Sequence, residues 1–169
     1  MQGSCEIGEK GWRIIVMVIK VIAFDVYGTI LAYAGQDRWG ADLTHPPREG
    51  LEILLDKCNE RGIIPVTSSD VESQDVRADL ARCFERFPER KLSTGRFCDF
   101  IWLNQMGVKD YFVIVDKYSL EPHELLAVDD KLANVQAARE IGCHGVHCTR
   151  YVAKRIDDWS FRAIDLDSF

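Results

Sequence analysis

Three stretches of the sequence place acidic or hydroxyl side chains directly after a run of apolar residues. Asp25 ends "VIKVIAFD", Thr67 to Asp70 end "IIPVTSSD", and Asp129 and Asp130 end "LLAVDD". Carboxylates that are brought close together repel one another, and a divalent cation that prefers oxygen ligands is the usual way to relieve this repulsion. The pattern therefore predicts a Mg²⁺ site in which Asp25, Asp129 and Asp130 meet.

These side chains can meet only if the apolar runs before them are neighbouring strands of one sheet. Residues 18–24 and 63–70 are typical of buried parallel strands, and an apolar stripe over 49–61, ended by Gly62, predicts a helix between them. Ligands of such sheets bind beyond the carboxyl ends of the strands, near the point where the strand order reverses. The three polar strand ends therefore form one candidate site.

The remaining sequence continues the alternation of strands and helices. A helix is predicted over 69–87, where Ser69 and Glu72 have the spacing of a capping box. Residues 110–120 fit a strand or a helix, and we favour a helix because the strand at 125–128 follows too soon for a parallel crossover. Further strands are expected at 98–103 and 145–149, and a further helix at 131–142. The prediction is an α/β fold with a doubly wound, mostly parallel sheet flanked by helices.

The length and composition predict one globular domain. The chain has 169 residues, of which 47% are hydrophobic and 28% charged. Because Met17 begins "MVIKVIAFD", we interpret residues 1–16 as an N-terminal extension and residues 17–169 as the domain. Six cysteines without a CxxC pair favour a reducing, cytoplasmic location.

The charge balance argues against nucleic acid or a membrane as the partner. The net charge is −6, and the longest apolar run, 14–24, is too short for a membrane span and is interrupted by Lys20. A local basic excess over 77–96 is interpreted as a solvated helix face, with contact to an anionic substrate as the alternative. No nucleotide-binding glycine motif of the GxxxxGK[ST] or GxGxxG type is found.

The stretches "FDVYGT", "VTSS" and "LLAVDDKLANVQAAREIG" together resemble the haloacid dehalogenase superfamily of aspartate-nucleophile hydrolases, over roughly residues 18–149. This resemblance implies a Rossmann-like core in which Asp25 attacks the substrate phosphorus and forms an aspartyl-phosphate that water hydrolyses. It also implies that Asp25, the backbone carbonyl of Tyr27 and Asp130 hold Mg²⁺, with Asp129 assisting.

The resemblance further implies residues that bind the substrate. Thr67 is expected to hydrogen-bond the transferred phosphoryl group, and Ser68 and Gly28 are expected to lie against the substrate. In this superfamily a lysine neutralises charge at the site, which a carboxylate needs in order to approach a phosphoryl dianion. The alignment places Gln105 where that lysine often stands, so Lys109 is the first candidate and Lys117 the second.

Tyr27 departs from the pattern of the superfamily's phosphatases, which usually carry an aspartate two residues after the nucleophile. That aspartate protonates the leaving group, and a phenol with a pKa near ~10 is a poor substitute for a step worth ~10²–10⁴-fold. The DxYGT form resembles the L-2-haloacid dehalogenases, whose halide leaving group needs no proton. Alternatively, the ring of Tyr27 packs under the loop.

The stretch "LAYAGQDRWGADLTHPP" is too short for the helical cap on which such dehalogenases rely. We therefore expect an open, capless site that suits a bulky phosphorylated substrate or is covered by a neighbouring subunit of a homo-oligomer. The leading hypothesis is a Mg²⁺-dependent phosphohydrolase. The alternatives are a dehalogenase-like hydrolase acting at carbon and a binding or regulatory protein with weak catalysis or none.

Overall fold

A five-stranded parallel sheet forms the centre of the computed structural model, which describes residues 18–35, 38–103, 107–156 and 158–169. The predicted extension at residues 1–16 and the aligned position Gln105 lie outside these ranges. The strand order is β5-β4-β1-β6-β7, and all neighbouring pairs are parallel. The strands are β1 (Val21–Phe24), β4 (Ile64–Ser69), β5 (Asp99–Trp102), β6 (Leu125–Asp129) and β7 (His144–His147).

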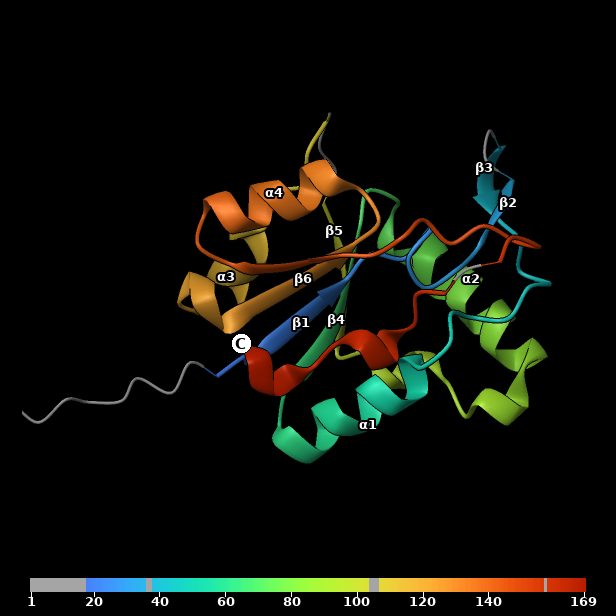
Figure 1. Ribbon diagram of the computed structural model, residues 1–169, viewed down its shortest axis with the longest axis horizontal. Coiled ribbons are helices and arrows are strands. Elements are labelled where there is room, and N and C mark those ends of the chain that lie inside the picture. Colours follow the sequence, from blue (N-terminus) through green and yellow to red (C-terminus); the bar gives the residue numbers. More distant parts are fainter. Residues whose placement is uncertain (1–17, 36–37, 104–106, 157) are drawn as a thin grey trace, which may run out of the picture.

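Helices cover both faces of this sheet, which confirms the doubly wound α/β prediction (Figure 1). Apolar residues of α1 and α2 share one core with the sheet, and apolar residues of α3 and α4 pack on the opposite face. None of the described helices is long and apolar enough to cross a bilayer. The helices are α1 (Leu51–Arg61), α2 (Ser73–Arg86), α3 (Phe112–Lys117) and α4 (Leu132–Glu140).

The strand order reverses between β1 and β6, since the chain builds β4 and β5 on one side of β1 and β6 and β7 on the other. Phe24 pairs with Thr67 of β4 and with Val128 of β6. The next residues, Asp25, Ser68 and Asp129, therefore reach the carboxyl edge of the sheet at the same level. This is the edge at which open α/β sheets bind their ligands.

The helices α2 and α3 differ most from the ranges predicted from the sequence. The helix predicted over 69–87 begins at Ser73, because Ser69 still belongs to β4, where it pairs with Trp102. The predicted capping box of Ser69 and Glu72 is wrong. Glu72 is the N-cap residue, and the Ser69 hydroxyl accepts a hydrogen bond from the Val71 amide at 3.1 Å. The ambiguous segment 110–120 is helical, as predicted, but α3 is shorter than that range.

A short hairpin lies between β1 and α1, the position at which the sequence predicted that no cap domain is inserted. Strands β2 (Tyr33–Gly35) and β3 (Arg38–Ala41) pair antiparallel, and among the described residues nothing larger is inserted between β1 and α1. The base of the hairpin is attached to the segment after β7: the Tyr33 amide donates to the Tyr151 carbonyl at 3.0 Å, and the Ala153 amide donates to the Tyr33 carbonyl at 2.8 Å. These strands were not predicted from the sequence, because they are too short to show a two-residue alternation.

The C-terminal segment belongs to the core of the domain. It forms two 3₁₀ helices, Phe161–Ala163 and Leu166–Ser168, beside α1 (Figure 1). The Phe161 ring is fully buried and meets the Phe24 ring edge-on, with ring centroids 5.7 Å apart. Ile164 and Leu166 are buried in the same apolar cluster. This segment therefore closes the face of the sheet that α1 leaves uncovered.

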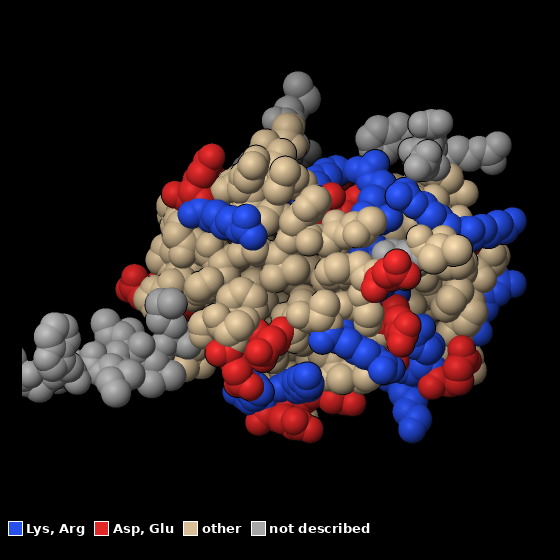
Figure 2. All heavy atoms as spheres, in the orientation of Figure 1, with Lys and Arg blue, Asp and Glu red and all other residues tan. Residues whose placement is uncertain are grey.

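Three of the basic side chains at 77–96 form ion pairs with carboxylates. Arg90 forms an ion pair with Glu52 at 2.9 Å, and Arg96 forms one with Asp56. Acidic and basic side chains lie next to one another over the side of the molecule where α1 and α2 are found (Figure 2). This arrangement is typical of a solvated surface with mixed charge, the first of the two interpretations of this stretch.

Candidate active site

Three carboxylates converge at the carboxyl edge of the sheet. Asp25 follows β1, Asp129 ends β6 and Asp130 comes next, and one oxygen of each lies within 4.8 Å of the other two. All three residues are buried. The Asp25 amide donates to the Val128 carbonyl at 2.8 Å, which extends the pairing of β1 with β6 by one residue. The structure therefore brings together the three aspartates that the sequence analysis selected.

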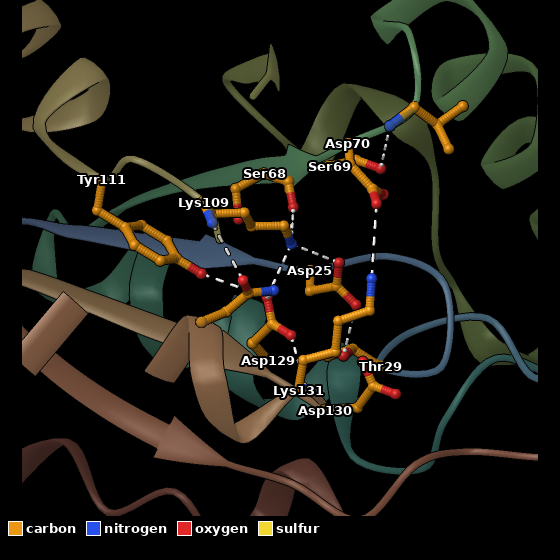
Figure 3. A network of polar contacts seen from close by, with 12 residues as sticks. Asp25, Thr29, Ser68, Ser69, Asp70, Lys109, Tyr111, Asp129, Asp130 and Lys131 are labelled. Atoms are coloured by element: carbon orange, nitrogen blue, oxygen red, sulfur yellow. Dashed lines mark hydrogen bonds and ion pairs between the residues drawn. The ribbon is translucent and has the colours of Figure 1, made fainter. Parts of the chain in front are cut away.

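Lys109 lies between two of these carboxylates (Figure 3). Its buried ammonium nitrogen, Nζ, is 2.5 Å from Asp25 Oδ1, 2.8 Å from Asp129 Oδ2 and 2.8 Å from the Ser68 carbonyl oxygen. The second candidate, Lys117, is half exposed and forms an ion pair with Asp99, away from the three aspartates. Of the two lysines considered from the sequence, only Lys109 reaches the site.

Asp129 has a full set of hydrogen-bond donors. Its Oδ2 accepts from Asn134 Nδ2 at 3.0 Å and from the Tyr111 hydroxyl at 3.3 Å, besides Lys109. Its Oδ1 accepts from the Lys131 amide at 2.8 Å. The protein thus directs four donors at Asp129 but only two at Asp25, so Asp129 is better suited to hold Lys109 in place than to bind a cation directly.

Asp130 has an oxygen that remains available. Its Oδ1 is buried and has no hydrogen-bond partner among the described residues. Buried carboxylate oxygens without a partner are rare, and they suit a hard divalent cation such as Mg²⁺. Asp25 lies opposite, with its Oδ2 accepting from the Thr29 hydroxyl at 2.8 Å. The donor set around Asp25 and Asp130 therefore fits Mg²⁺.

Burial and the neighbouring charges shift the pKa values of the side chains at this site. Burial raises the pKa of Asp25 to about 7; Lys109 opposes this rise, and the charges of Asp129 and Asp130 add to it. Burial also raises the pKa of Asp130 above its usual value. Burial opposes the charge of Lys109, but the neighbouring Asp25 and Asp129 help to outweigh this effect and raise the pKa of the lysine. The site thus favours an additional positive charge or a proton.

Gly28 makes the tight turn after Asp25 possible. Its φ is +81°, and a Cβ built there would lie 2.5 Å from Tyr33 Cε2 and 2.7 Å from Asp130 Oδ2. Both distances are shorter than real Cβ contacts, so only glycine fits without displacing a neighbour. Gly28 was predicted to lie against the substrate, and the structure places it against Asp130.

Two adjacent residues of β4, the strand next to β1, carry buried hydroxyls. The Thr67 and Ser68 side-chain oxygens are buried, and neither has a hydrogen-bond partner among the described residues. Thr67 pairs with Phe24, so Ser68 is the residue level with Asp25. Because successive side chains of a strand point to opposite faces, these two hydroxyls leave the strand on different sides.

Tyr27 has a specific partner that the sequence did not indicate. Its hydroxyl donates a hydrogen bond of 2.6 Å to Asp79 Oδ2 of α2. Burial, reinforced by the Asp79 carboxylate, raises the pKa of Tyr27 above its usual value. The ring packs against the core on the α1 and α2 side of the sheet, as in the alternative that places it under the loop. The phenol therefore keeps its proton.

A cavity of about 480 Å³ lies between the hairpin and α2, and Lys131 connects it to the three aspartates, which do not line it themselves. Lys131, the residue after Asp130, lines it and reaches across to Asp70 at 3.5 Å, as Figure 3 shows. The two tyrosines Tyr27 and Tyr33 form its aromatic walls. Its full lining consists of Tyr27, Tyr33, Gly40, Asp70, Val71, Asp75, Asp79, Arg82 and Lys131.

Several residues of the site were not selected from the sequence. Thr29, Asn134 and Tyr111 bind the carboxylates of Asp25 and Asp129 through side chains that resemble ordinary turn, cap and core residues in the sequence. Thr29 alone had a local signal, as the last residue of "FDVYGT". Asn134 and Tyr111 can be recognised as site residues only from the fold, which places them beside Asp129.

Comparisons by sequence give no relatives for this chain. No protein-family model matches it, and no curated protein matches it significantly. Comparisons by structure do find the same fold in solved proteins. The N-terminal part of the protein BF1531 from Bacteroides fragilis, which contains a phosphatase domain, matches with a TM-score of 0.58 and 18% identity over 78% of this chain. This chain spans only 36% of that one.

Two further structures match over most of their own length. A predicted phosphoglycolate phosphatase from Haemophilus somnus has a TM-score of 0.56 and 13% identity, and the match covers 82% of this chain and 89% of that one. CbbY from Rhodobacter sphaeroides has a TM-score of 0.57 and 12% identity, with coverages of 85% and 92%. Others of the matched structures are described as HAD-superfamily hydrolases. The chain therefore shares its core fold with these hydrolases and phosphatases, and its described residues include no large cap.

Proposed function

We propose that this protein is a Mg²⁺-dependent phosphohydrolase that uses Asp25 as its nucleophile. One observation carries the proposal: Lys109 binds both Asp25 and Asp129, while Asp130 beside them keeps an oxygen without a partner among the described residues. The Bacteroides fragilis structure is a complex with Mg, and the Rhodobacter sphaeroides structure is a complex with phosphate. The proposal assigns the same two kinds of ligand to this site.

The residues that would hold the cation are Asp25, Asp130 and the backbone carbonyl of Tyr27. Asp129 would assist by fixing Lys109 and Asn134, with which it already forms hydrogen bonds. Bound Mg²⁺ would neutralise negative charge on the phosphoryl group and on the carboxylates. Together with Lys109 it would allow a carboxylate to approach a phosphoryl dianion.

The first chemical step is attack by a carboxylate oxygen of Asp25 on phosphorus. The bond between phosphorus and the leaving oxygen breaks, the leaving group departs with the electron pair, and Asp25 becomes an aspartyl-phosphate. Asp25 must be ionised for this attack, and Lys109 favours its ionised form against the effect of burial. The Ser68 hydroxyl, which is level with Asp25 and has no other partner among the described residues, would donate to the phosphoryl oxygens, whereas Thr67 leaves β4 on the other side.

In the second step a water molecule attacks the phosphorus of the aspartyl-phosphate. The bond between phosphorus and Asp25 breaks, inorganic phosphate leaves, the proton of the water is released to solvent, and Asp25 returns to its carboxylate form. Tyr27 takes no part in the proton transfer, because its hydroxyl already donates to Asp79 and its pKa is raised.

The leaving group would occupy the cavity between Tyr27, Tyr33 and Asp79. Because Tyr27 is not placed to protonate it, we expect substrates whose leaving oxygen is stable as an anion, such as aryl phosphates and phosphoanhydrides. The open carboxyl edge also carries exposed apolar side chains, Trp102, Phe112 and Leu132. These features support a bulky substrate, or a second subunit over the site, which light scattering of the purified protein would detect.

The test is a panel of aryl and alkyl phosphates and 2-haloacids, assayed with and without Mg²⁺ beside Asp25→Asn. We expect Mg²⁺-dependent release of phosphate by the parent, faster for leaving groups of low pKa, and none by the variant. Release of halide without a metal, equal rates for aryl and alkyl phosphates, or an active Asp25→Asn variant would each contradict part of the proposal. The first would identify a hydrolase acting at carbon.

A further inference from the structure

Asp130 is held by an arginine from a distant part of the chain. Arg150, which lies after β7, has its Nε 2.7 Å from Asp130 Oδ2. The Asp130 side chain is 0% exposed, whereas the Arg150 side chain is 44% exposed. The guanidinium thus reaches from the surface to a fully buried carboxylate, and it binds the oxygen opposite to the unpartnered Oδ1.

The position of Arg150 is itself fixed by the loops around the site. Its guanidinium carbon lies 5.3 Å from the centre of the Tyr33 ring, a cation–π contact. The next residue, Tyr151, donates its amide to the Gly28 carbonyl at 2.8 Å and accepts from the Tyr33 amide at 3.0 Å. Arg150 therefore stands between the turn that follows Asp25 and the base of the hairpin.

We propose that Arg150 is a positioning residue of the metal site. By holding Oδ2 of Asp130 it prevents rotation of the carboxylate and keeps Oδ1 available for a cation shared with Asp25. Outer-shell partners of metal ligands typically change metal affinity about 10–100-fold when they are removed. The inference rests on the proposed Mg²⁺-dependent function and adds to it a residue outside the stretches that resemble the superfamily.

Charge and geometry predict opposite consequences of removing Arg150. As a cation near a cation site it repels Mg²⁺, so if Arg150 only compensated the charge of Asp130, its loss would tighten Mg²⁺ binding. As a positioning group it stabilises the orientation in which Asp130 binds the cation, so its loss would weaken binding. The sign of the change in affinity distinguishes the two roles.

The experiment is a calorimetric titration of the full chain with Mg²⁺ at constant ionic strength, for the parent, Arg150→Met and Arg150→Lys. We expect the dissociation constant to rise tenfold or more in Arg150→Met, and Arg150→Lys to lie between the parent and that variant. Arg162→Met is the matched control, because Arg162 is an exposed arginine that pairs with the exposed Glu49 at 3.4 Å. It should bind Mg²⁺ like the parent.

Each outcome has a definite meaning. An unchanged or lower dissociation constant in Arg150→Met, with a parent that binds Mg²⁺, overturns the role of Arg150 and leaves the proposed function standing. A parent that binds no Mg²⁺ overturns both. If circular dichroism shows that Arg150→Met is unfolded, Arg150→Lys decides: weaker binding than the parent supports the proposal, and equal binding refutes it.

Discussion

Asp129 and Asp130 are neighbours in the chain, but they belong to two different halves of the site. Around Asp129 lies a closed half in which Lys109, Asn134 and Tyr111 satisfy the carboxylate from inside the protein. Around Asp130 lies an open half, where a partly exposed Arg150 holds one oxygen and the other has no partner among the described residues. The closed half is preorganised before any ligand binds, and the open half provides the space for the ligand.

The largest expected effect comes from removing the centre of the closed half. Lys109→Met leaves buried carboxylates without their cation, which typically costs about 3–5 kcal/mol of stability. We expect kcat for an aryl phosphate to fall by about 10²–10³-fold, the usual loss when one charge-stabilising donor is removed. Urea unfolding and steady-state kinetics measure the two effects.

The control for this change is Lys117→Met. Lys117 forms an ion pair with Asp99 and is half exposed, so its loss should cost about 1 kcal/mol or less. If the two variants were equally stable and equally active, Lys109 would neither stabilise the buried carboxylates nor contribute to catalysis.

The second effect is a pH dependence of stability without metal. The pKa of Asp25 is raised from 3.8 to about 7 in the folded state, so between these values the folded protein binds more protons than the unfolded chain. Stability from this group is present below pH 4 and is lost as the pH rises through 7. Three pKa units correspond to at most about 4 kcal/mol.

The measurement compares the free energy of unfolding of the parent and Asp25→Asn from pH 4 to 8 in a chelator. The stability of the parent relative to the variant should fall across this range, and saturating Mg²⁺ should remove the fall. A constant difference would show that the pKa of Asp25 is not raised in the folded protein. The comparison with the variant cancels other carboxylates whose pKa is lowered, such as Asp99.

The third prediction tests the open half through its turn. Gly28→Ala places a Cβ against Asp130 and Tyr33 at a positive φ, which should cost about 1–3 kcal/mol and weaken Mg²⁺ binding. Gly62→Ala has a similar φ of +67° but no heavy atom within 4 Å, so it isolates the backbone strain, about 1–2 kcal/mol. Mg²⁺ titration of both variants should show a loss of affinity in Gly28→Ala alone. If both variants bound Mg²⁺ with the same affinity, the turn at Gly28 would have no influence on the cation site.

The smallest effect is expected for Tyr27→Phe. The change removes the hydrogen bond to Asp79, which is worth about 1 kcal/mol, and leaves the ring in place. Because the phenol is not placed to protonate the leaving group, kcat for alkyl phosphates should change little. A decrease of about 10²-fold or more, limited to poor leaving groups, would identify Tyr27 as a general acid.

The sequence predicted the features that depend on local periodicity. Alternating strands and helices define the sheet, and parallel strands bring Asp25 and Asp129 to one edge without further information. Lys109 could be selected because it lies just before the predicted helix, and the structure places it between these carboxylates. The resemblance to the superfamily agrees with the observed fold.

Features that depend on contacts between distant segments could not be predicted. Arg150 is separated from Asp130 by the whole α4 and β7 unit, and Tyr27 reaches Asp79 across the sheet edge to α2. The hairpin at 33–41 is too short to show a period, and the burial of Phe161 depends on a gap beside α1 that only the folded sheet defines. No local pattern contains this information.

The proposed mechanism requires a covalent bond between Asp25 and phosphorus. The parent protein, mixed with an aryl phosphate and Mg²⁺ and quenched in acid within one turnover, should yield an Asp25-containing peptide heavier by one phosphoryl group. The same peptide from Asp25→Asn should be unmodified, and that variant should release no phosphate. Turnover by the parent without phosphorylation of Asp25, or turnover by the variant, would contradict the assignment of the nucleophile.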